Sequence, residues 1–361
     1  MSRFRSGLHQ DNEMTRHLVP LLALLSSLSM ACTESGEEAD AGAVTLSAGS
    51  GGTTTSESGE ESTGDEGAKL DFGPGNDSAA ATDGDGEGCE KIDLLFVIDN
   101  SGSMQTEQDN LIAAFPEFAA TIQDVLPDAS DLHIAVTTTD DLGLQPGSFG
   151  QDAQPFAEDP CMNQLGGLVD RATPVNGNSG YGEPCGFSSG QRYMTNGPAL
   201  SQEFECAAAV GVHGNGLERH ADAILGALDA DDACAAGFVR DDALLVIVVI
   251  TDEDDDWSEP DISDVEARVD QWYAAIEAVE GGVETNVVFT LISGGSPPWG
   301  TCPPFELDDP DTAKESDVLT TLARRFTNVF EADVCAPGYV DVFADAIGVI
   351  ETACDEFVPI E

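Results

Sequence analysis

The sequence predicts an α/β fold, in which a doubly wound, mostly parallel sheet has helices on both faces. Two observations support it. Near-continuous apolar runs of strand length lie at 94–98, 134–138, 244–250 and 287–292, as expected for parallel strands buried on both faces. Segments with helical spacing of apolar residues lie between these runs. Such alternation is typical of doubly wound α/β domains.

The helical pattern occurs in three internal segments. Apolar residues repeat every three or four positions from Ile112 to Ile122, from His220 to Leu228 and from Val265 to Ile276. Each segment therefore predicts a helix with one apolar face. A short strand at 326–330 and a final helix at 340–354 complete one domain, and no transmembrane helix is predicted.

One part of the predicted domain at 89–361 does not fit this alternation. Residues 141–198 are rich in Gly, Pro, Asn and Ser and contain Cys161 and Cys185. A loop of this length inside a compact domain usually has a function. We therefore expect a disulfide-stapled insertion that forms a recognition surface.

Residues 1–31 are predicted to be a signal peptide. The apolar run from Leu18 to Met30 is too short to span a bilayer but suits a signal-peptide core. Basic residues lie just before it, so Met14 is an alternative start. The stretch 28–32 resembles a bacterial lipoprotein lipobox, which implies that Cys32 is lipidated; an ordinary signal peptide cut nearby is the alternative.

Residues 32–88 change abruptly to Gly, Ser, Thr, Ala, Asp and Glu. Such a segment buries too little apolar surface to offset its chain entropy, so a disordered linker is predicted. Thr33, where an Asp would resemble an inner-membrane retention signal, favours the outer membrane or cell surface. The expected product is an exported lipoprotein that contacts the membrane only through its lipid, or else a secreted protein.

Charge and cysteine content exclude several partners and sites. The chain has 68 Asp and Glu against 13 Lys and Arg, giving a net charge of -55. It cannot neutralise phosphates over an extended surface, which argues against nucleic acid and anionic headgroups. Its nine cysteines include no CxxC pair, which disfavours a zinc ribbon. Apart from Cys32 they form an even set, consistent with disulfides in an oxidising compartment.

Acidic side chains follow three of the predicted strands. Asp99 follows 94–98, Asp140 follows the second run and Asp252 follows 244–250. The carboxyl ends of parallel strands meet at one edge of a sheet, where ligands bind. Clustered carboxylates are costly unless a cation compensates them. Helix capping is the alternative, and for Asp140 alone it suffices.

The pattern Asp99-x-Ser101-x-Ser103 favours a cation further. On a tight turn, alternate side chains face the same way, so one carboxylate and two hydroxyls can approach one ion. Oxygen ligands with few fixed charges suit Mg2+ or Mn2+, and Ca2+ remains an alternative.

Residues 96–104, FVIDNSGSM, resemble the first motif of von Willebrand factor type A (VWA) domains, and residues 238–256 resemble the fourth-strand segment of bacterial secreted members. Their metal-ion-dependent adhesion site (MIDAS) combines Asp-x-Ser-x-Ser with a Thr from a second loop and an Asp from a third, which Asp252 matches. The resemblance covers about 90–354. It implies that Ser101 and Ser103 bind the metal directly and that Asp99 and Asp252 act directly or through water.

The second loop departs from this pattern. It should correspond to residues 210–218, which contain no Thr. His213 and Asn215 are candidate replacements, and a histidine nitrogen would shift the preference toward Mn2+ or Zn2+. Val212 in this position would instead weaken the metal.

Eight cysteines permit 105 pairings, so sequence alone leaves the connectivity open. The VWA resemblance implies that the domain termini meet, which favours a Cys89–Cys354 disulfide. Pairing of sequence neighbours then gives the remaining expected set, Cys161–Cys185, Cys206–Cys234 and Cys302–Cys335.

The resemblance implies a binding module on the cell surface, whose cation accepts an acidic side chain from a protein or matrix ligand. A structural envelope protein with a degenerate metal site is the second interpretation, favoured by the missing Thr. A metal-assisted hydrolase is the third, although the chain has no G-x-S-x-G or HExxH motif. We therefore expect no enzymatic activity.

Overall fold

The computed structural model describes the chain in several ranges, 89–139, 159–172, 182–212, 214, 216–255, 265–295, 300, 302–305 and 312–360. The predicted signal peptide, the linker with Cys32, and residues 141–158 and 173–181 of the insertion lie outside these ranges. Asp140, His213 and Asn215 lie outside them too.

Within the described residues, six strands form one sheet in the order β3-β2-β1-β4-β5-β6. The strands are β1 (Lys91–Ile98), β2 (Asp131–Thr138), β3 (Met194–Thr195), β4 (Leu244–Ile250), β5 (Val287–Ser293) and β6 (Asn328–Asp333). Only the pairing of β3 with β2 is antiparallel. Ile98 is in register with Thr138 on β2 and with Ile250 on β4. These three neighbouring strands therefore end at the same level, which places the turns that follow them side by side.

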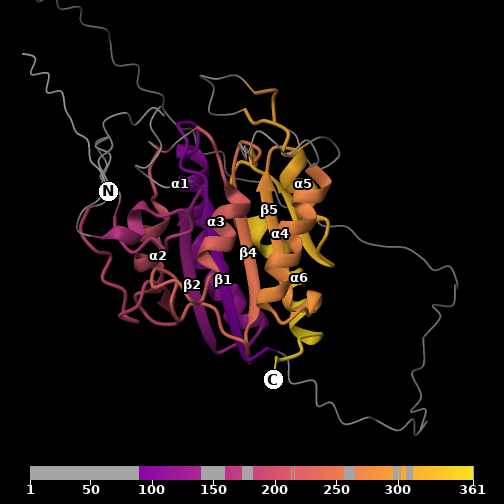
Figure 1. Ribbon diagram of the computed structural model, residues 1–361. Coiled ribbons are helices and arrows are strands. Elements are labelled where there is room, and N and C mark those ends of the chain that lie inside the picture. Colours follow the sequence, from indigo (N-terminus) through magenta and orange to yellow (C-terminus); the bar gives the residue numbers. More distant parts are fainter. Residues whose placement is uncertain are drawn as a thin grey trace, which may run out of the picture. The chain divides into compact units, whose positions relative to one another are not determined.

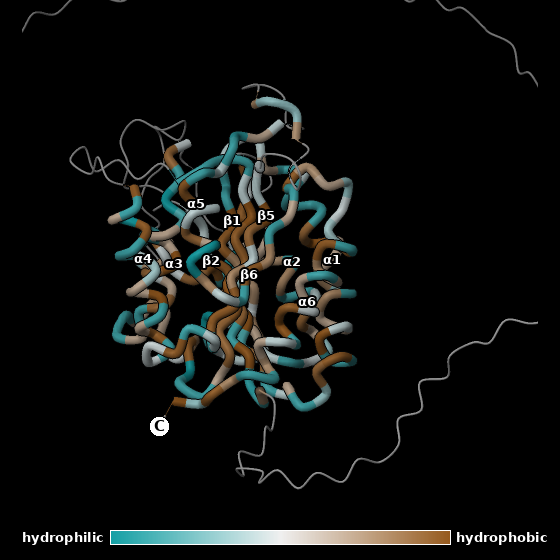
Figure 2. Tube along the Cα trace, turned by 90° about the vertical axis from the view of Figure 1, so that its right-hand side faces the viewer, coloured by the Kyte–Doolittle hydropathy of each residue, from teal (hydrophilic) through white to brown (hydrophobic). Residues whose placement is uncertain are grey.

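Helices cover both faces of this sheet (Figure 2). The helices are α1 (Gln105–Val125), α2 (Leu200–Ala208), α3 (His220–Ala227), α4 (Val265–Val279), α5 (Asp317–Ala323) and α6 (Val340–Asp355), with short 3-10 turns η1 (Pro160–Asn163) and η2 (Glu284–Asn286). Figure 2 shows α1, α2 and α6 on one side of the strands and α3, α4 and α5 on the other. None of the helices in the described ranges is both long enough and apolar enough to cross a membrane.

Two separate cores follow from this layering. Along β1, Phe96 belongs to the core under α1, α2 and α6, whereas its neighbours Leu95 and Val97 belong to the core under α3, α4 and α5. Side chains of a strand alternate between faces, so a strand buried on both sides must be apolar throughout. Figure 2 shows the resulting continuous hydrophobic colour of the central strands.

The prediction of an α/β fold with a mostly parallel sheet is confirmed. β4 covers the predicted residues 244–250. β6 begins later than predicted, because Phe326 does not join the strand but stacks on Phe289, with ring centroids 5.3 Å apart. The sequence prediction missed the two-residue β3 and the short helices α2 and α5. In α2 the buried Leu200, Phe204 and Ala208 do repeat at helical spacing, a signal that the sequence prediction did not use.

The described parts of the insertion are held together by ion pairs. Asp159 caps the start of η1, accepting a hydrogen bond from the backbone of Cys161 at 3.2 Å. Its carboxylate also pairs with Arg171 and Arg192. Arg192 further pairs with Asp170 at 3.2 Å. Charges from both described parts of the insertion therefore meet at one point.

Four disulfides join the eight cysteines of the described residues. Cys89–Cys354 and Cys302–Cys335 coincide with the expected pairs. Figure 1 shows the C-terminus at the same end of the domain as the start of β1, as the first pair requires. The other two expected pairs are wrong, because the structure has Cys161–Cys234 and Cys185–Cys206 instead.

The pairing differs from the expected one because each described part of the insertion packs on the body of the domain. η1 lies against the turn that follows α3, where the Gln164 amide donates to Asp232. The second part of the insertion lies against α2, where the backbone N–H of Ser188 donates to Glu203 at 2.8 Å. Cys161 and Cys185 therefore each lie beside a cysteine in the body of the domain.

Peptide mapping of the unreduced protein is expected to find Cys161 linked to Cys234 and Cys185 linked to Cys206. Their Cα atoms are 5.3 Å and 5.8 Å apart, within the range for a relaxed disulfide. Recovery of a Cys161–Cys185 peptide would contradict the folding of the insertion onto the domain.

A buried acid lies just beyond the end of α4. Glu280 is 1% exposed, and its Oε2 has no hydrogen-bond partner among the described residues. Burial, and then the negative charge of Asp93, raise the pKa of Glu280 to about 8. Burial also raises the pKa of Asp93 to about 7, although Arg240 pairs with it at 2.7 Å.

Replacing Glu280 with Gln is expected to make the protein more stable than the native form in alkaline solution. A carboxyl with a raised folded pKa contributes stability below its unfolded pKa, and this stability is lost as the pH rises through about 8. A folded pKa that lies one pH unit above the unfolded pKa corresponds to about 1.4 kcal/mol, so the two proteins should differ in stability by a few kcal/mol. Urea denaturation between the ordinary carboxyl pKa of 4.5 and a pH above about 8 measures the difference in the free energy of unfolding. The exposed Glu351→Gln serves as the control, and equal pH profiles for both variants would refute the expectation.

Candidate metal centre

Two acidic turns meet at the carboxyl edge of the sheet. The backbone N–H of Asp99 donates to Ile250 at 3.1 Å, and that of Thr251 donates to Ile292 at 3.1 Å. These bonds continue the strand pairing by one residue. They fix Asp99 beside the turn that begins at Thr251.

Asp99 is fully buried, and the protein satisfies both of its carboxylate oxygens. Oδ1 accepts the backbone N–H of Ser101 at 2.7 Å, and Oδ2 accepts the hydroxyl of Thr251 at 2.7 Å. Burial, and then the charge of Asp252, raise the pKa of Asp99 to about 8. The sequence interpretation did not predict this contact of Thr251 with Asp99. The position of Thr251 directly after β4 was the only sequence signal for it.

Asp252 differs from Asp99 in its partners. It is 1% exposed, and neither of its carboxylate oxygens has a hydrogen-bond partner among the described residues. Burial is the main cause that raises its pKa to about 6. The Ser103 hydroxyl lowers this pKa because it lies close by, although outside hydrogen-bond geometry. A carboxylate removed from water without a partner costs several kcal/mol or must stay protonated. A cation at this position would remove that cost.

The two serines of the first turn lie beside these acids. The hydroxyl oxygens of Ser101 and Ser103 are 3.4 Å apart. Ser101 is buried and Ser103 half-buried. The structure therefore brings together the four site residues that the sequence predicted, and it offers carboxylate and hydroxyl oxygens that suit a hard divalent cation.

The other described acids of the turn after β4 have different roles. Glu253 forms an ion pair with Lys314 at 2.8 Å. Asp254 accepts two backbone N–H groups at the start of α5, at 2.9 Å and 3.1 Å. Asp255 accepts the backbone N–H of Ala221 near the start of α3 at 2.9 Å. Helix capping, which the sequence suggested only as an alternative, thus explains Asp254 and Asp255.

The second loop lies directly on the first turn. The backbone N–H of Gly214 donates to the carbonyl of Asn100 at 2.8 Å. The Gln108 amide on α1 donates to the carbonyl of Gly211 at 2.8 Å and accepts its N–H at 3.1 Å. Gln108 also reaches the carbonyl of Asp99 at 3.2 Å, a positioning role that no sequence pattern indicated. The candidate replacements for the missing Thr, His213 and Asn215, are not among the described residues.

Another buried acid at this edge comes from the chain segment just before α3. Glu218 is fully buried and accepts a hydrogen bond from the hydroxyl of Thr139, which follows β2. The backbone N–H of Arg219 donates to the carbonyl of Thr139 at 3.1 Å. The sequence interpretation did not single out Glu218, which places a further carboxyl group at this edge.

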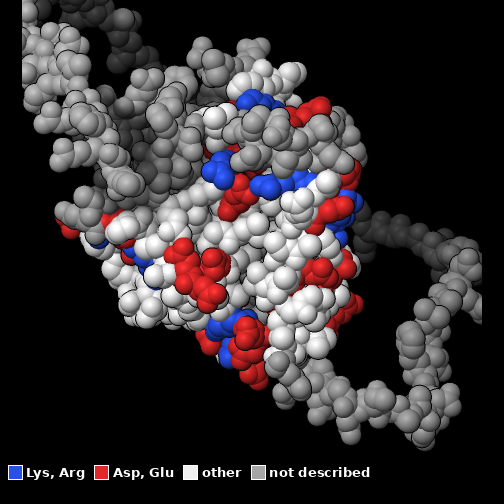
Figure 3. All heavy atoms as spheres, in the orientation of Figure 1, with Lys and Arg blue, Asp and Glu red and all other residues white. Residues whose placement is uncertain are grey.

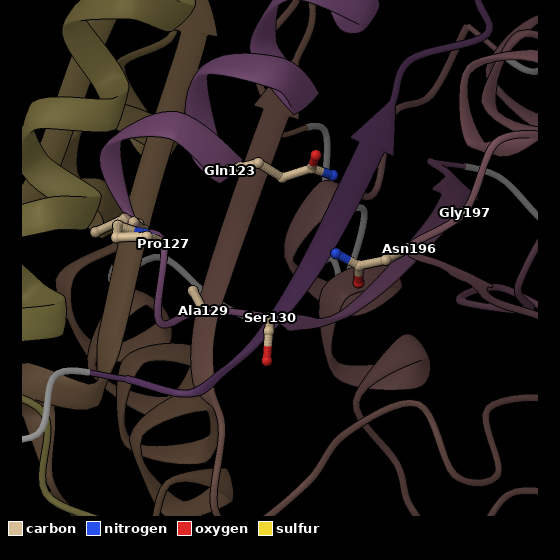
Figure 4. A pocket seen from close by; sticks show the side chains of 7 residues that line it. Gln123, Pro127, Ala129, Ser130, Asn196 and Gly197 are labelled. Atoms are coloured by element: carbon tan, nitrogen blue, oxygen red, sulfur yellow. The ribbon is translucent and has the colours of Figure 1, made fainter.

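A surface pocket lies elsewhere, beyond the C-terminal end of α1 (Figure 4). It has a volume of about 420 Å3 and is lined by Gln123, Leu126, Pro127, Ala129, Ser130, Asn196 and Gly197. Asn196 also accepts the backbone N–H of Leu132 in β2 at 2.6 Å. The pocket shares no lining residue with the acidic edge, so it is separate from the candidate metal centre.

The face of the domain formed by α3, α4 and α5 shows basic side chains next to acidic ones (Figure 3). Asp222 pairs with Arg219 at 2.8 Å and with Arg268 at 3.2 Å. Arg325 pairs with Asp270 at 2.9 Å. Each of these arginines thus has an acidic partner beside it, and together they form no basic patch among the described residues of this face.

Comparisons with known proteins found no matching family model and no matching curated protein. Two solved structures of proximal thread matrix protein 1 from the mussel byssus are similar to 74% of this chain. One has 12% identity and a TM-score of 0.35 over 49% of its own length. The other has 14% identity and a TM-score of 0.30 over 47%. The chain thus spans about half the length of these proteins, and similarity at this level assigns no function to it.

Proposed function

We propose that the chain is a binding module of the VWA type, which holds a divalent cation at the carboxyl edge of its sheet. The observation that carries this proposal is Asp252, a buried carboxylate with no hydrogen-bond partner among the described residues, next to the buried Asp99. The ligands would be Asp252 with Ser101 and Ser103. Asp99, whose oxygens are already occupied, would act through water.

The arrangement of the strands supports this proposal. The order β3-β2-β1-β4-β5-β6 is the order of doubly wound sheets. The candidate site lies where the order reverses, between β1 and its two neighbours. Ligands of doubly wound domains bind at this switch point. The motif at 96–104 that resembles VWA domains forms the first turn of the site.

The proposed ligand is an acidic side chain of a partner protein or matrix component. Mg2+ or Mn2+ bound by oxygen ligands keeps coordination positions for water or an incoming carboxylate. A protein with a net charge of -55 repels acidic partners unless a cation bridges them. The lysine nearest the edge, Lys314, already pairs with Glu253.

The proposed location of the module rests on the N-terminal sequence alone. We propose export and attachment of Cys32 to the outer membrane or cell surface by lipid, with residues 33–88 as the tether. Metabolic labelling with a radioactive fatty acid tests the anchor, and Cys32→Ala is the matched control.

A pull-down from envelope and extracellular fractions tests the function. We expect the native domain to retain partners with Mg2+ or Mn2+ and to release them with a chelator. Asp252→Asn should retain none in either condition. Retention that is independent of both chelator and Asp252 would favour the structural envelope protein, an interpretation supported by the absence of Thr from residues 210–218. Release of product from generic ester or peptide substrates would favour the hydrolase.

A further inference from the structure

A second group of potential ligands lies at the end of β6. The ligand atoms of Cys302, Asp333 and Cys335 all lie within 4.8 Å of one another, and the three residues are half-buried. The Cys302 sulfur is 2.9 Å from Oδ1 of Asp333. The two sulfurs form a disulfide, so the trio holds no thiolates while the bond is intact.

We propose that this trio is a redox-gated Zn2+ site. Two thiolates and one carboxylate are a ligand set that Zn2+ accepts, with water in the fourth position. Hard cations such as Mg2+ avoid thiolates. The site is therefore chemically distinct from the oxygen ligands near Asp252, and it does not depend on the function proposed above.

The backbone keeps the three ligands close when the disulfide opens. Asp333 is the last residue of β6, and its carboxylate accepts the backbone N–H of Cys335 at 3.0 Å. The backbone N–H of Val334 donates to Ser293 of β5 at 3.1 Å. Cys302 is followed by a bridge between Pro304 and Ala313. Both arms of the site thus have supports that do not involve the disulfide.

The opening step requires a reductant, which we identify by class as a dithiol. Its two electrons break the bond between the sulfurs of Cys302 and Cys335, and the dithiol becomes a disulfide. The two new thiols release their protons when their sulfurs bind Zn2+. Exchange with a disulfide, such as the oxidised form of the same dithiol, reverses the step. The disulfide takes two electrons from the two thiolates and two protons from solvent to become a dithiol, the bond between the sulfurs of Cys302 and Cys335 forms again, and the metal is released. The site therefore exists only in the reduced protein.

Cobalt binding to the full chain tests the proposal, because Co2+ replaces Zn2+ and shows an absorption band when thiolates bind it. The protein is first reduced with a phosphine, which is then removed under anaerobic conditions. Co2+ is titrated in the presence of excess Mg2+, so that Mg2+ occupies the oxygen ligands near Asp252. We expect the reduced native protein to bind one more equivalent than reduced Cys302→Ser/Cys335→Ser, with a thiolate band that Zn2+ abolishes. The oxidised native protein should show no band.

Asp333→Asn keeps both thiols and tests the third ligand. Because even an outer-shell partner is worth about 10- to 100-fold in affinity, its loss should weaken Co2+ binding at least tenfold. Alkylation of the native protein gives a measurement that needs no folded variant. Zn2+ should protect Cys302 and Cys335, but not the other reduced cysteines, from iodoacetamide. Equal stoichiometry with the double variant, unchanged affinity of Asp333→Asn, or absence of protection would overturn the proposal.

Discussion

Replacing Asp252 with Asn is expected to stabilise the metal-free protein and to abolish its response to divalent cations. In the metal-free state, the carboxylate of Asp252 is buried without a hydrogen-bond partner among the described residues. It also lies close enough to Asp99 for its charge to raise the pKa of that residue. Asn has nearly the same shape and no charge, so it removes both the desolvation cost and the repulsion.

The native protein should behave in the opposite way when a cation is added. A ligand that binds only the folded state stabilises it by about 2.7 kcal/mol at a hundred times its dissociation constant. The native protein should therefore melt below Asp252→Asn in chelator and above it in saturating Mg2+ or Mn2+. Thermal denaturation followed by circular dichroism measures both curves.

Asp254→Asn is the matched control for this experiment, since Asp254 lies two residues away on the same turn. Asp254 accepts two backbone N–H groups at the start of α5, and Asn can replace only part of this cap. We expect a loss of about 1 kcal/mol with and without cation, and an unchanged shift on adding Mg2+. An Asp252→Asn protein that is less stable than the native form in chelator, or that retains the cation shift, would contradict the proposed ligand set.

The acidic turn after β4 illustrates how far the sequence predicts this site. The apolar run 244–250 predicts a buried strand, and parallel strands place their following turns at one edge, so the approach of Asp99 to Asp252 could be predicted. The separate roles of Asp252, Glu253, Asp254 and Asp255 could not. These roles depend on where α3, α5 and Lys314 lie, and adjacent acids carry no local signal of such distant partners.

The disulfides show the same limit. Pairing of sequence neighbours assumes that the insertion folds on itself, which is a local rule. Instead, contacts of Gln164 with Asp232 and of Ser188 with Glu203 attach it to the domain. Cys161 and Cys185 then meet partners on the domain, at Cys234 and Cys206. Connectivity follows tertiary packing, which the apolar pattern of strands and helices does not encode for irregular segments.

Replacing Gly214 with Ala is expected to weaken cation binding at least tenfold. An added Cβ would lie 2.3 Å from Oδ1 of Asn100 and 2.5 Å from its Cγ. Asn100 is 1% exposed, and its carbonyl accepts the backbone N–H of Gly214, so neither partner can retreat into solvent. Overpacking of this kind costs about 1 to 3 kcal/mol and displaces backbone. Because Asn100 lies between Asp99 and Ser101, the displacement reaches the ligands directly.

Gly216→Ala is the matched control, because a Cβ at Gly216 meets no atom within 4 Å. Both substitutions remove one glycine from the same loop and therefore reduce the freedom of the unfolded chain by similar amounts. Isothermal titration with Mn2+ compares the two variants with the native protein. We expect Gly216→Ala to bind like the native protein, and a smaller thermal shift on adding Mn2+ for Gly214→Ala alone. Equal affinities of the two variants would show that the second loop does not position the first turn, and the cation would then depend only on Asp252 and its immediate neighbours.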